Sequence, residues 1–179
     1  MKYQLKVNKQ RIFDILLYFH HKILNKLIND QIKKFDKKGN FVLELGAGNK
    51  SYKTNFKHAK VITTDLIDSN KIDEIADITN LKYDPNTFDL IICNNVFEHL
   101  SDPIKGASEV YRCLKKDGEL FLVVPFLFPL HDEPFDFFRY SSEGLKVLFN
   151  KFNLVYIQNI NYLFQFNKFV LYFVGVFRK

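Results

Sequence analysis

The chain has 179 residues, of which 47% are hydrophobic and 26% are charged, and it contains two cysteines. This length and composition fit one globular domain with a sizeable core, and they exclude a disordered chain, a collagen-like chain, a coiled coil and a disulfide scaffold. The formal net charge of +6 favours an acidic partner, but only four of the 26 basic residues are arginine, which disfavours nucleic-acid recognition.

The first predicted element is an amphipathic helix over residues 9–35. Its apolar residues recur at helical spacing: Ile12, Ile15, Leu16, Phe19, Ile23 and Leu27. Gly39 is the expected C-terminal cap of this helix. The amino terminus has no signal-peptide pattern, and no apolar run approaches the roughly 20 residues that a membrane span needs. We therefore expect a cytoplasmic protein without a transmembrane segment, and peripheral membrane contact by the apolar C-terminal strand stays open.

Seven short strands and two further helices follow along the chain. The strands are predicted over residues 41–45, 61–66, 72–78, 88–93, 119–124, 154–160 and 169–177. The helices are predicted over residues 103–116 and from Ser141 or Ser142 to about Phe152. Strands that alternate with helices indicate a parallel sheet, but the last two strands lack the roughly 10 residues that a crossover needs. The expected fold is therefore α/β: a Rossmann-like, doubly wound, mostly parallel seven-stranded sheet with a C-terminal antiparallel hairpin.

The strongest local signal is the segment VLELGAGNKS, residues 42–51. A strand delivers Glu44 and then the turn Gly46-Ala47-Gly48. The glycines permit a sharp turn and close approach of a ligand to the backbone, and amides at the start of a following helix would face a carboxylate or phosphate. An acid such as Glu44 suits a positively charged ligand. Ser51 stands where a dinucleotide fingerprint needs Gly or Ala, which disfavours a nicotinamide cofactor.

Polar residues also end the next predicted strands. Asp65 closes the second strand, about 20 residues beyond the glycines, where a carboxylate accepts hydrogen bonds from ribose hydroxyls. Asp77 lies at the end of the third predicted strand, and Asn94 ends the fourth. Because open α/β sheets bind ligands at the carboxyl ends of their strands, we expect these groups to converge on one site. The alternative for each residue alone is a solvated strand end.

These segments resemble the motifs of class I S-adenosylmethionine-dependent methyltransferases. The resemblance runs in order through VLELGAGNKSY, VITTDL, IADITNLKYDPNTFDLIICNNVFEHLSDP and VYRCLKKDGELFLVVP, over about residues 41–125. It implies S-adenosyl-L-methionine as the cofactor and a cofactor-binding set of Glu44, Gly46, Ala47, Gly48, Asp65, Leu66, Asp77, Ile78 and Asn94. In this set the loop borders the methionine part, Asp65 holds the ribose, Leu66, Asp77 and Ile78 lie at the adenine, and Asn94 lies beside the methyl group. Lys50 replaces the family's third glycine.

A second, narrower resemblance covers residues 125–145, PFLFPLHDEPFDFFRYSSEGL. The segment is similar to H-x-x-P-x-D-x-x-R-Y segments of methyltransferases linked to surface-polysaccharide or glycolipid pathways. It implies an acceptor-side position for this segment, with Arg139 and Tyr140 as acceptor-binding residues. Within it, His131 is the expected general base, because histidine is the side chain that changes charge near neutral pH, and Asp136 would orient or replace it. The alternatives are an Asp136–Arg139 ion pair that staples the loop and a Tyr140 that only packs.

Glu98 and His99 are weaker candidates for catalysis. In the family, the motif that holds Glu98 and His99 more often shapes a loop and caps the next helix than performs catalysis. The spacing of His and Cys residues suggests no metal site.

The lead hypothesis is methyl transfer from S-adenosyl-L-methionine to an oxygen or nitrogen of a small-molecule or glycan acceptor. We expect one domain, with an N-terminal helical segment (1–39), a cofactor-binding core (40–125), an acceptor-side segment (126–151) and a C-terminal hairpin (152–179). A monomer or a homodimer is expected. The alternatives are a nicotinamide-dependent sugar-modifying enzyme, a non-catalytic methyltransferase-like subunit and, less favoured without a base-flipping motif after residue 93, a nucleic-acid methyltransferase.

Overall fold

The computed structural model describes residues 9–161 and 170–179, and the side chains of the first helix from Lys22 onward. Its helices are α1 (Lys9–Phe35), α2 (Pro103–Cys113) and α3 (Ser142–Leu148), with short 3-10 helices η1 (Lys53–Asn55) and η2 (Phe97–His99). Its strands are β1 (Phe41–Leu45), β2 (Lys60–Asp65), β3 (Glu74–Ile75), β4 (Phe88–Asn94), β5 (Leu114–Pro125), β6 (Asn153–Asn161) and β7 (Val170–Arg178). The first eight residues and the connection of the predicted hairpin, 162–169, lie outside the described residues.

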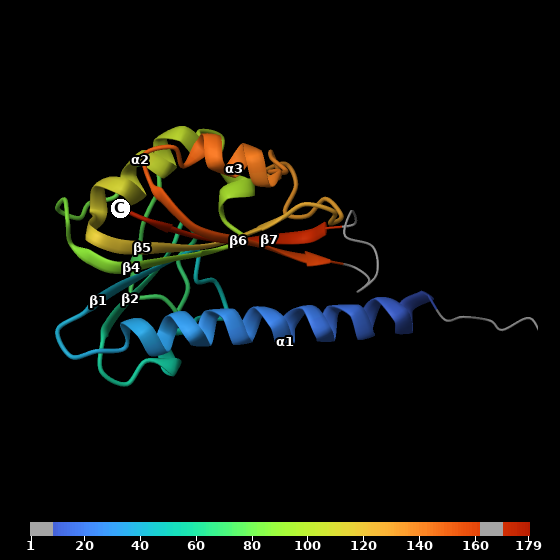
Figure 1. The fold of residues 1–179 in the computed structure, drawn as a ribbon, viewed down its shortest axis with the longest axis horizontal. Coiled ribbons are helices and arrows are strands. Elements are labelled where there is room, and N and C mark those ends of the chain that lie inside the picture. Colours follow the sequence, from blue (N-terminus) through green and yellow to red (C-terminus); the bar gives the residue numbers. More distant parts are fainter. Residues whose placement is uncertain (1–8, 162–169) are drawn as a thin grey trace, which may run out of the picture.

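The seven strands form one sheet in the order β3-β2-β1-β4-β5-β7-β6. The pairs from β3 to β5 are parallel, and β7 is antiparallel to both β5 and β6. The predicted mostly parallel, Rossmann-like sheet with a C-terminal hairpin is therefore confirmed. The reversed strand β7 lies between β5 and β6, so that β6 forms the rim (Figure 1).

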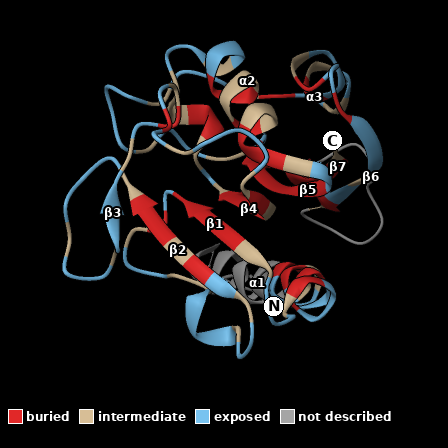
Figure 2. Ribbon diagram, turned by 90° about the vertical axis from the view of Figure 1, so that its left-hand side faces the viewer, coloured by how far each residue is buried: buried red, intermediate tan, exposed pale blue. Residues whose placement is uncertain are grey.

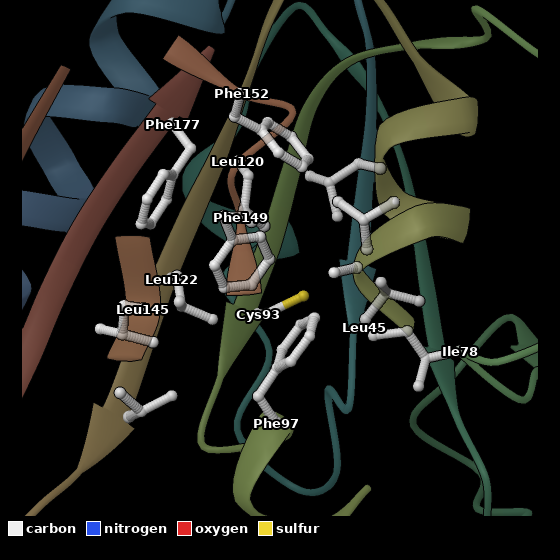
Figure 3. Close-up of a cluster of buried hydrophobic side chains, with 14 of the residues drawn as sticks. Leu45, Ile78, Cys93, Phe97, Leu120, Leu122, Leu145, Phe149, Phe152 and Phe177 are labelled. Atoms are coloured by element: carbon white, nitrogen blue, oxygen red, sulfur yellow. The ribbon is translucent and has the colours of Figure 1, made fainter. Parts of the chain in front are cut away.

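Helices cover both faces of this sheet. Figure 1 shows α1 along one face, with α2 and α3 on the other. Ile28 and Ile32 of α1 pack with Val42 and Phe121 in one apolar cluster. The second cluster lies under α2 and α3 and includes Cys93 and Phe149 (Figure 3). Burial is concentrated in the central strands, whereas β3 and β6 at the rims are largely exposed (Figure 2).

The helix expected after the glycine loop is absent. Residues 46–87, all of them described, contain only the short η1 as helical structure. The segment NKSYKTNFKHA has no apolar stripe at helical spacing, and its Tyr52, Phe56 and Ala59 instead pack against the cluster on the α1 side. Consequently, no helix amino terminus faces the loop, and any anion there would meet only loop amides.

Two helix ends also differ from expectation. The helix predicted over residues 103–116 ends at Cys113, because β5 begins at Leu114, where it pairs with Phe88 before a register shift. Gly39 has a positive φ of +91°, but α1 ends four residues earlier, at Phe35. This glycine therefore serves the turn into β1 and is not the helix cap.

Within the described residues, no helix combines the length and apolarity required to cross a bilayer.

Candidate functional site

The carboxyl ends of the parallel strands bring the predicted cofactor residues to one edge. Leu45 of β1 pairs with Thr64 of β2 and with Cys93 of β4. The next residues of those two strands, Asp65 and Asn94, therefore flank the glycine loop on either side. This register places the ends of β1, β2 and β4 at one edge of the sheet.

The glycine loop is tied to β2 by backbone and side-chain contacts. The Gly48 amide donates to Asp65 Oδ2 at 3.0 Å, and the Ala47 amide donates to the Thr64 carbonyl at 2.9 Å. Gly46 has a φ of +65°, and a Cβ on it would lie 2.3 Å from Cγ2 of Val96, so glycine is required here. At Gly48, with a φ of +49°, a Cβ would meet nothing closer than Asp65 Oδ2 at 3.8 Å.

Glu44 is buried beneath this loop, with 3% of its surface exposed. Its carboxylate accepts hydrogen bonds from the Ser51 hydroxyl at 2.6 Å and from the Tyr52 amide at 3.0 Å. Burial raises the pKa of the Glu44 carboxyl, although these hydrogen bonds act in the opposite direction. In the structure Glu44 therefore holds the loop in place.

Tyr52 joins the loop to Asn94, and sequence reasoning missed it. The Asn94 side-chain amide donates to the Tyr52 hydroxyl at 3.1 Å. Burial, together with the nearby charge of Glu44, raises the pKa of Tyr52 to about 12. Oδ1 of Asn94 is buried and has no hydrogen-bond partner among the described residues. A buried acceptor of this kind needs a donor, and it lies at the end of β4 where the sequence predicts the cofactor.

The residues predicted to contact adenine differ in exposure. Leu66 is 70% exposed, whereas Ile78 is only 5% exposed and belongs to the apolar cluster under α2. The exposed carboxylate of Asp77 accepts hydrogen bonds from the amide and the hydroxyl of Thr79, both at 2.8 Å. A ligand at this edge would therefore meet the side chain of Leu66 but only the backbone of Ile78.

The acceptor-side segment after β5 is organised around Asp136. Oδ2 of Asp136 accepts a hydrogen bond from the His131 amide at 3.0 Å and lies 3.3 Å from Nδ1 of the same histidine. Arg139 pairs with the same carboxylate, with Nη2 2.7 Å from Oδ2. This hydrogen bond with Arg139 holds the pKa of Asp136 far below its usual range. The structure therefore contains both contacts that the sequence left as alternatives: Asp136 beside His131, and the ion pair between Asp136 and Arg139.

Tyr140 lies in the core, 9% exposed, and its hydroxyl donates to the Phe97 carbonyl at 3.0 Å. This burial favours the packing alternative over acceptor binding. Arg139 also bonds to the Phe138 carbonyl, so most of its donors face the protein.

Glu98 is fully buried beside this segment. Its backbone carbonyl accepts hydrogen bonds from the amides of Phe137 and Phe138, at 2.9 and 3.1 Å. This contact supports a loop-shaping role for the motif VFEHLSDP. Its Asp102 caps α2, because the Asp102 side chain accepts a hydrogen bond from the Lys105 amide. Burial raises the pKa of Glu98 to about 8. Although the spacing of the sequence suggested no metal site, ligand-type atoms of Glu98, His99 and His131 lie within 4.8 Å of one another.

A separate hollow of about 510 Å³ lies between α2 and α3. Its lining includes Ile104, Val147 and Phe152, and it contains none of the residues that the sequence predicted for the cofactor or the acceptor.

Comparison with known proteins assigns the chain to a family. A family model described as a methyltransferase domain matches residues 18–167. An uncharacterized protein of Methanocaldococcus jannaschii is 30% identical over 161 residues, which cover 83% of this chain and 71% of that protein.

Solved structures share the fold at low sequence identity. A S-adenosylmethionine-dependent methyltransferase from Archaeoglobus fulgidus is 14% identical with a TM-score of 0.67, covering 86% of this chain and 94% of its own. The [4+2]-cyclase SpnF is 14% identical with a TM-score of 0.68, covering 85% of this chain and 79% of its own. At such identities the likeness establishes the fold alone, and the two neighbours carry different reactions on it.

Proposed function

The chain belongs to the methyltransferase domain family, and we propose that it transfers a methyl group from S-adenosyl-L-methionine to an oxygen or nitrogen of a small-molecule or glycan acceptor. The family supplies the reaction class and the cofactor: this is a S-adenosylmethionine-dependent methyltransferase. The acceptor, the methylated atom and the role of each residue are the proposed part.

The strand-end residues fit the chemistry of this cofactor, which carries a sulfonium, an ammonium, a carboxylate and a ribose. Asp65 is the single observation that carries the proposal, because its carboxylate closes β2 beside the glycine loop, in reach of ribose hydroxyls. The unpartnered Oδ1 of Asn94 and the negative charge of Glu44 suit the cationic side. Gly46 is exposed, so the carboxylate of the cofactor can approach the backbone of the loop there.

When bound, the cofactor supplies a methyl group on an activated sulfonium leaving group. The protein's task is then mainly to align the acceptor with that group, and such alignment lowers the barrier by up to about 7–11 kcal/mol. In the proposed reaction Nε2 of His131 takes the proton of an acceptor hydroxyl. Asp136, 3.3 Å from Nδ1, fixes the ring and stabilises its protonated form.

The acceptor-side segment offers an apolar surface beside His131. Large apolar side chains that are 38–68% exposed gather on it: Phe126, Leu127, Leu130, Phe135, Phe137 and Phe138. Exposed patches of this kind commonly mark binding sites. Together with the resemblance of this segment to glycan-linked methyltransferases, the patch supports an acceptor that presents an apolar face, such as a sugar ring or a glycolipid.

Calorimetric titration of the purified chain with S-adenosylhomocysteine, and separately with NAD, tests the cofactor. We expect binding of S-adenosylhomocysteine and none of NAD. The reverse result would support the nicotinamide-dependent alternative.

Release of S-adenosylhomocysteine in the presence of a panel of glycans and small molecules tests the transfer. We expect Asp136→Asn to lower the rate of release without changing the affinity for S-adenosylhomocysteine. Cofactor binding without turnover on any acceptor would favour the non-catalytic alternative.

A further inference from the structure

Three metal-ligand groups meet between η2 and the acceptor-side segment. Nε2 of His99 lies 3.8 Å from Oε1 of Glu98, and Nε2 of His131 lies 4.0 Å from the same oxygen. The two imidazole rings are nearly perpendicular, with centroids 4.9 Å apart. Two neighbouring residues and a third one 32 positions later therefore direct ligand atoms at one point.

Both imidazoles are held by their other ring nitrogen. Nδ1 of His99 lies 2.9 Å from the Phe135 carbonyl, and Nδ1 of His131 lies 3.2 Å from the Pro129 carbonyl and 3.3 Å from Asp136 Oδ2. Carbonyl and carboxylate oxygens accept only, so Nδ1 carries the proton in both rings. Each Nε2 is left with an electron pair, the arrangement in which outer hydrogen bonds orient metal-binding histidines.

Glu98 would supply the negative charge at this point once a bound ion displaces its proton. Its side chain is 0% exposed, and within the described part of the chain neither carboxylate oxygen has a hydrogen-bond partner. A buried carboxylate without partners is costly. The hydrogen bonds from Phe137 and Phe138 to the Glu98 carbonyl fix the backbone from which this carboxylate projects. The two Nε2 atoms that it faces are too distant for hydrogen bonds.

The surrounding charges also favour a cation. Asp136 is paired with Arg139, which leaves Glu98 and the exposed Asp132, whose Oδ2 lies 4.0 Å from Nε2 of His99. With Glu98 ionised, these two carboxylates beside two neutral imidazoles match the charge of one divalent ion.

We propose that Glu98, His99 and His131 bind a divalent transition-metal ion of the zinc type. Two histidines and one carboxylate form a ligand set of catalytic zinc sites, which keep a further position open. With bonds of about 2.1 Å, tetrahedral ligand atoms lie roughly 3.4 Å apart. The two observed separations from Glu98 Oε1 are 3.8 and 4.0 Å, and all three ligand atoms lie within 4.8 Å of one another, so the side chains must approach by roughly half an ångström to 1.4 Å to bind one ion.

The open coordination position of the ion suggests how the acceptor is activated, and this inference rests on the proposed function. A hydroxyl oxygen of the acceptor would occupy it, and the ion would lower the pKa of that hydroxyl so that its proton leaves to water. The ion takes the electron pair that His131 would otherwise use as a base, so the two routes to deprotonation exclude each other. The acceptor class is then one with an oxygen able to bind zinc.

Calorimetry of the full chain without a histidine tag, stripped with chelator and titrated with Zn²⁺, tests the site. We expect one equivalent to bind through these groups, and Co²⁺ at the same site to give visible absorption. Glu98→Gln and His131→Ala should each weaken binding at least 10–100-fold, the range found for loss of a mere outer-shell partner. The exposed His58 provides the matched control, because His58→Ala should leave binding unchanged.

Equal Zn²⁺ affinity in the wild type and both variants would overturn the site. Absence of visible Co²⁺ absorption in the wild type would also overturn it, and this measurement does not depend on the folding of a variant. S-adenosylhomocysteine titrated into the same samples separates the two proposals. Cofactor binding without Zn²⁺ binding overturns the metal site alone. Zn²⁺ binding without cofactor binding supports the metal site and overturns the proposed methyl transfer.

Discussion

The carboxylate of Asp65 accepts a hydrogen bond from the backbone amide of Gly48 at 3.0 Å, which joins the end of β2 to the loop that follows β1. The other oxygen of Asp65 accepts from the Ile67 amide at 3.1 Å. One side chain thus fixes the two turns between which the ribose of the cofactor is proposed to lie.

Asp65→Ala should weaken binding of S-adenosylhomocysteine about 10–100-fold, because hydrogen bonds to a charged group contribute about 1.5–3 kcal/mol. Calorimetric titration measures this loss. Asp65→Asn retains an oxygen for the Gly48 amide and separates loop disruption from loss of the charge. The exposed neighbour Asp68 is the control, and Asp68→Ala should bind as the wild type does. Unchanged affinity in Asp65→Ala would remove Asp65 from the cofactor site.

Gly46 and Gly39 allow backbone strain to be separated from crowding. Both have a positive φ, but a Cβ on Gly46 would meet Val96 at 2.3 Å, whereas one on Gly39 would meet nothing within 4 Å. Gly39→Ala should cost about 1–2 kcal/mol of unfolding free energy from backbone strain alone. Gly46→Ala should cost about 1–3 kcal/mol more, from overpacking. Urea denaturation measures both, and equal losses would contradict the close approach of the loop to Val96.

The sheet and its ligand edge were predictable because they rest on local patterns. Apolar runs such as FVLEL and FDLIIC mark buried strands. Glu44 lies near the end of its run, and Asp65 and Asn94 close theirs, so the sequence could place all three near one edge of the sheet. The absence of a helix after the loop was not predicted, because a glycine turn after a strand indicates the start of a helix, although the segment itself lacks an apolar stripe.

Contacts between segments that are distant in the sequence could not be predicted from local patterns. Tyr52 is an ordinary aromatic residue in the sequence, and only the fold brings its hydroxyl to Asn94. His131 lies 32 positions after His99, in a segment without regular structure, so no spacing rule for metal ligands could join them to Glu98.

Glu109 should make the stability of the protein depend on acid pH. Its carboxylate bonds to Arg112 at 2.8 Å and to the Leu81 amide at 2.9 Å, and Arg112 in turn binds the carbonyls of Leu81 and Tyr83, which fastens the loop before β4 to α2. The hydrogen bond with Arg112 lowers the pKa of Glu109 below its ordinary value of 4.5. Because the folded state favours the ionised form, this stabilisation is present above pH 4.5 and is lost as the pH falls below it.

Thermal unfolding of the wild type and Glu109→Gln between pH 3 and pH 7 measures this dependence. We expect the variant to lose about 1–3 kcal/mol at neutral pH and to converge with the wild type in acid. Glu143→Gln, in an exposed pair with Lys146, should match the wild type throughout. A difference that stays constant across the range would show that the charge of Glu109 contributes nothing.

Glu119 should be the most sensitive charge in the contact between α1 and the sheet. Its side chain is 1% exposed and pairs with Lys34 of α1 at 2.6 Å and with Arg178 of β7 at 2.7 Å. Replacing both cations in Lys34→Met/Arg178→Met leaves the buried carboxylate unpaired, which costs about 3–5 kcal/mol in comparable cases. Adding Glu119→Gln should recover part of that loss, because it removes the unpaired charge, while Lys146→Met should cost less than about 0.5 kcal/mol. Urea denaturation measures all three, and a double variant as stable as Lys146→Met would mean that solvent reaches Glu119 and screens it.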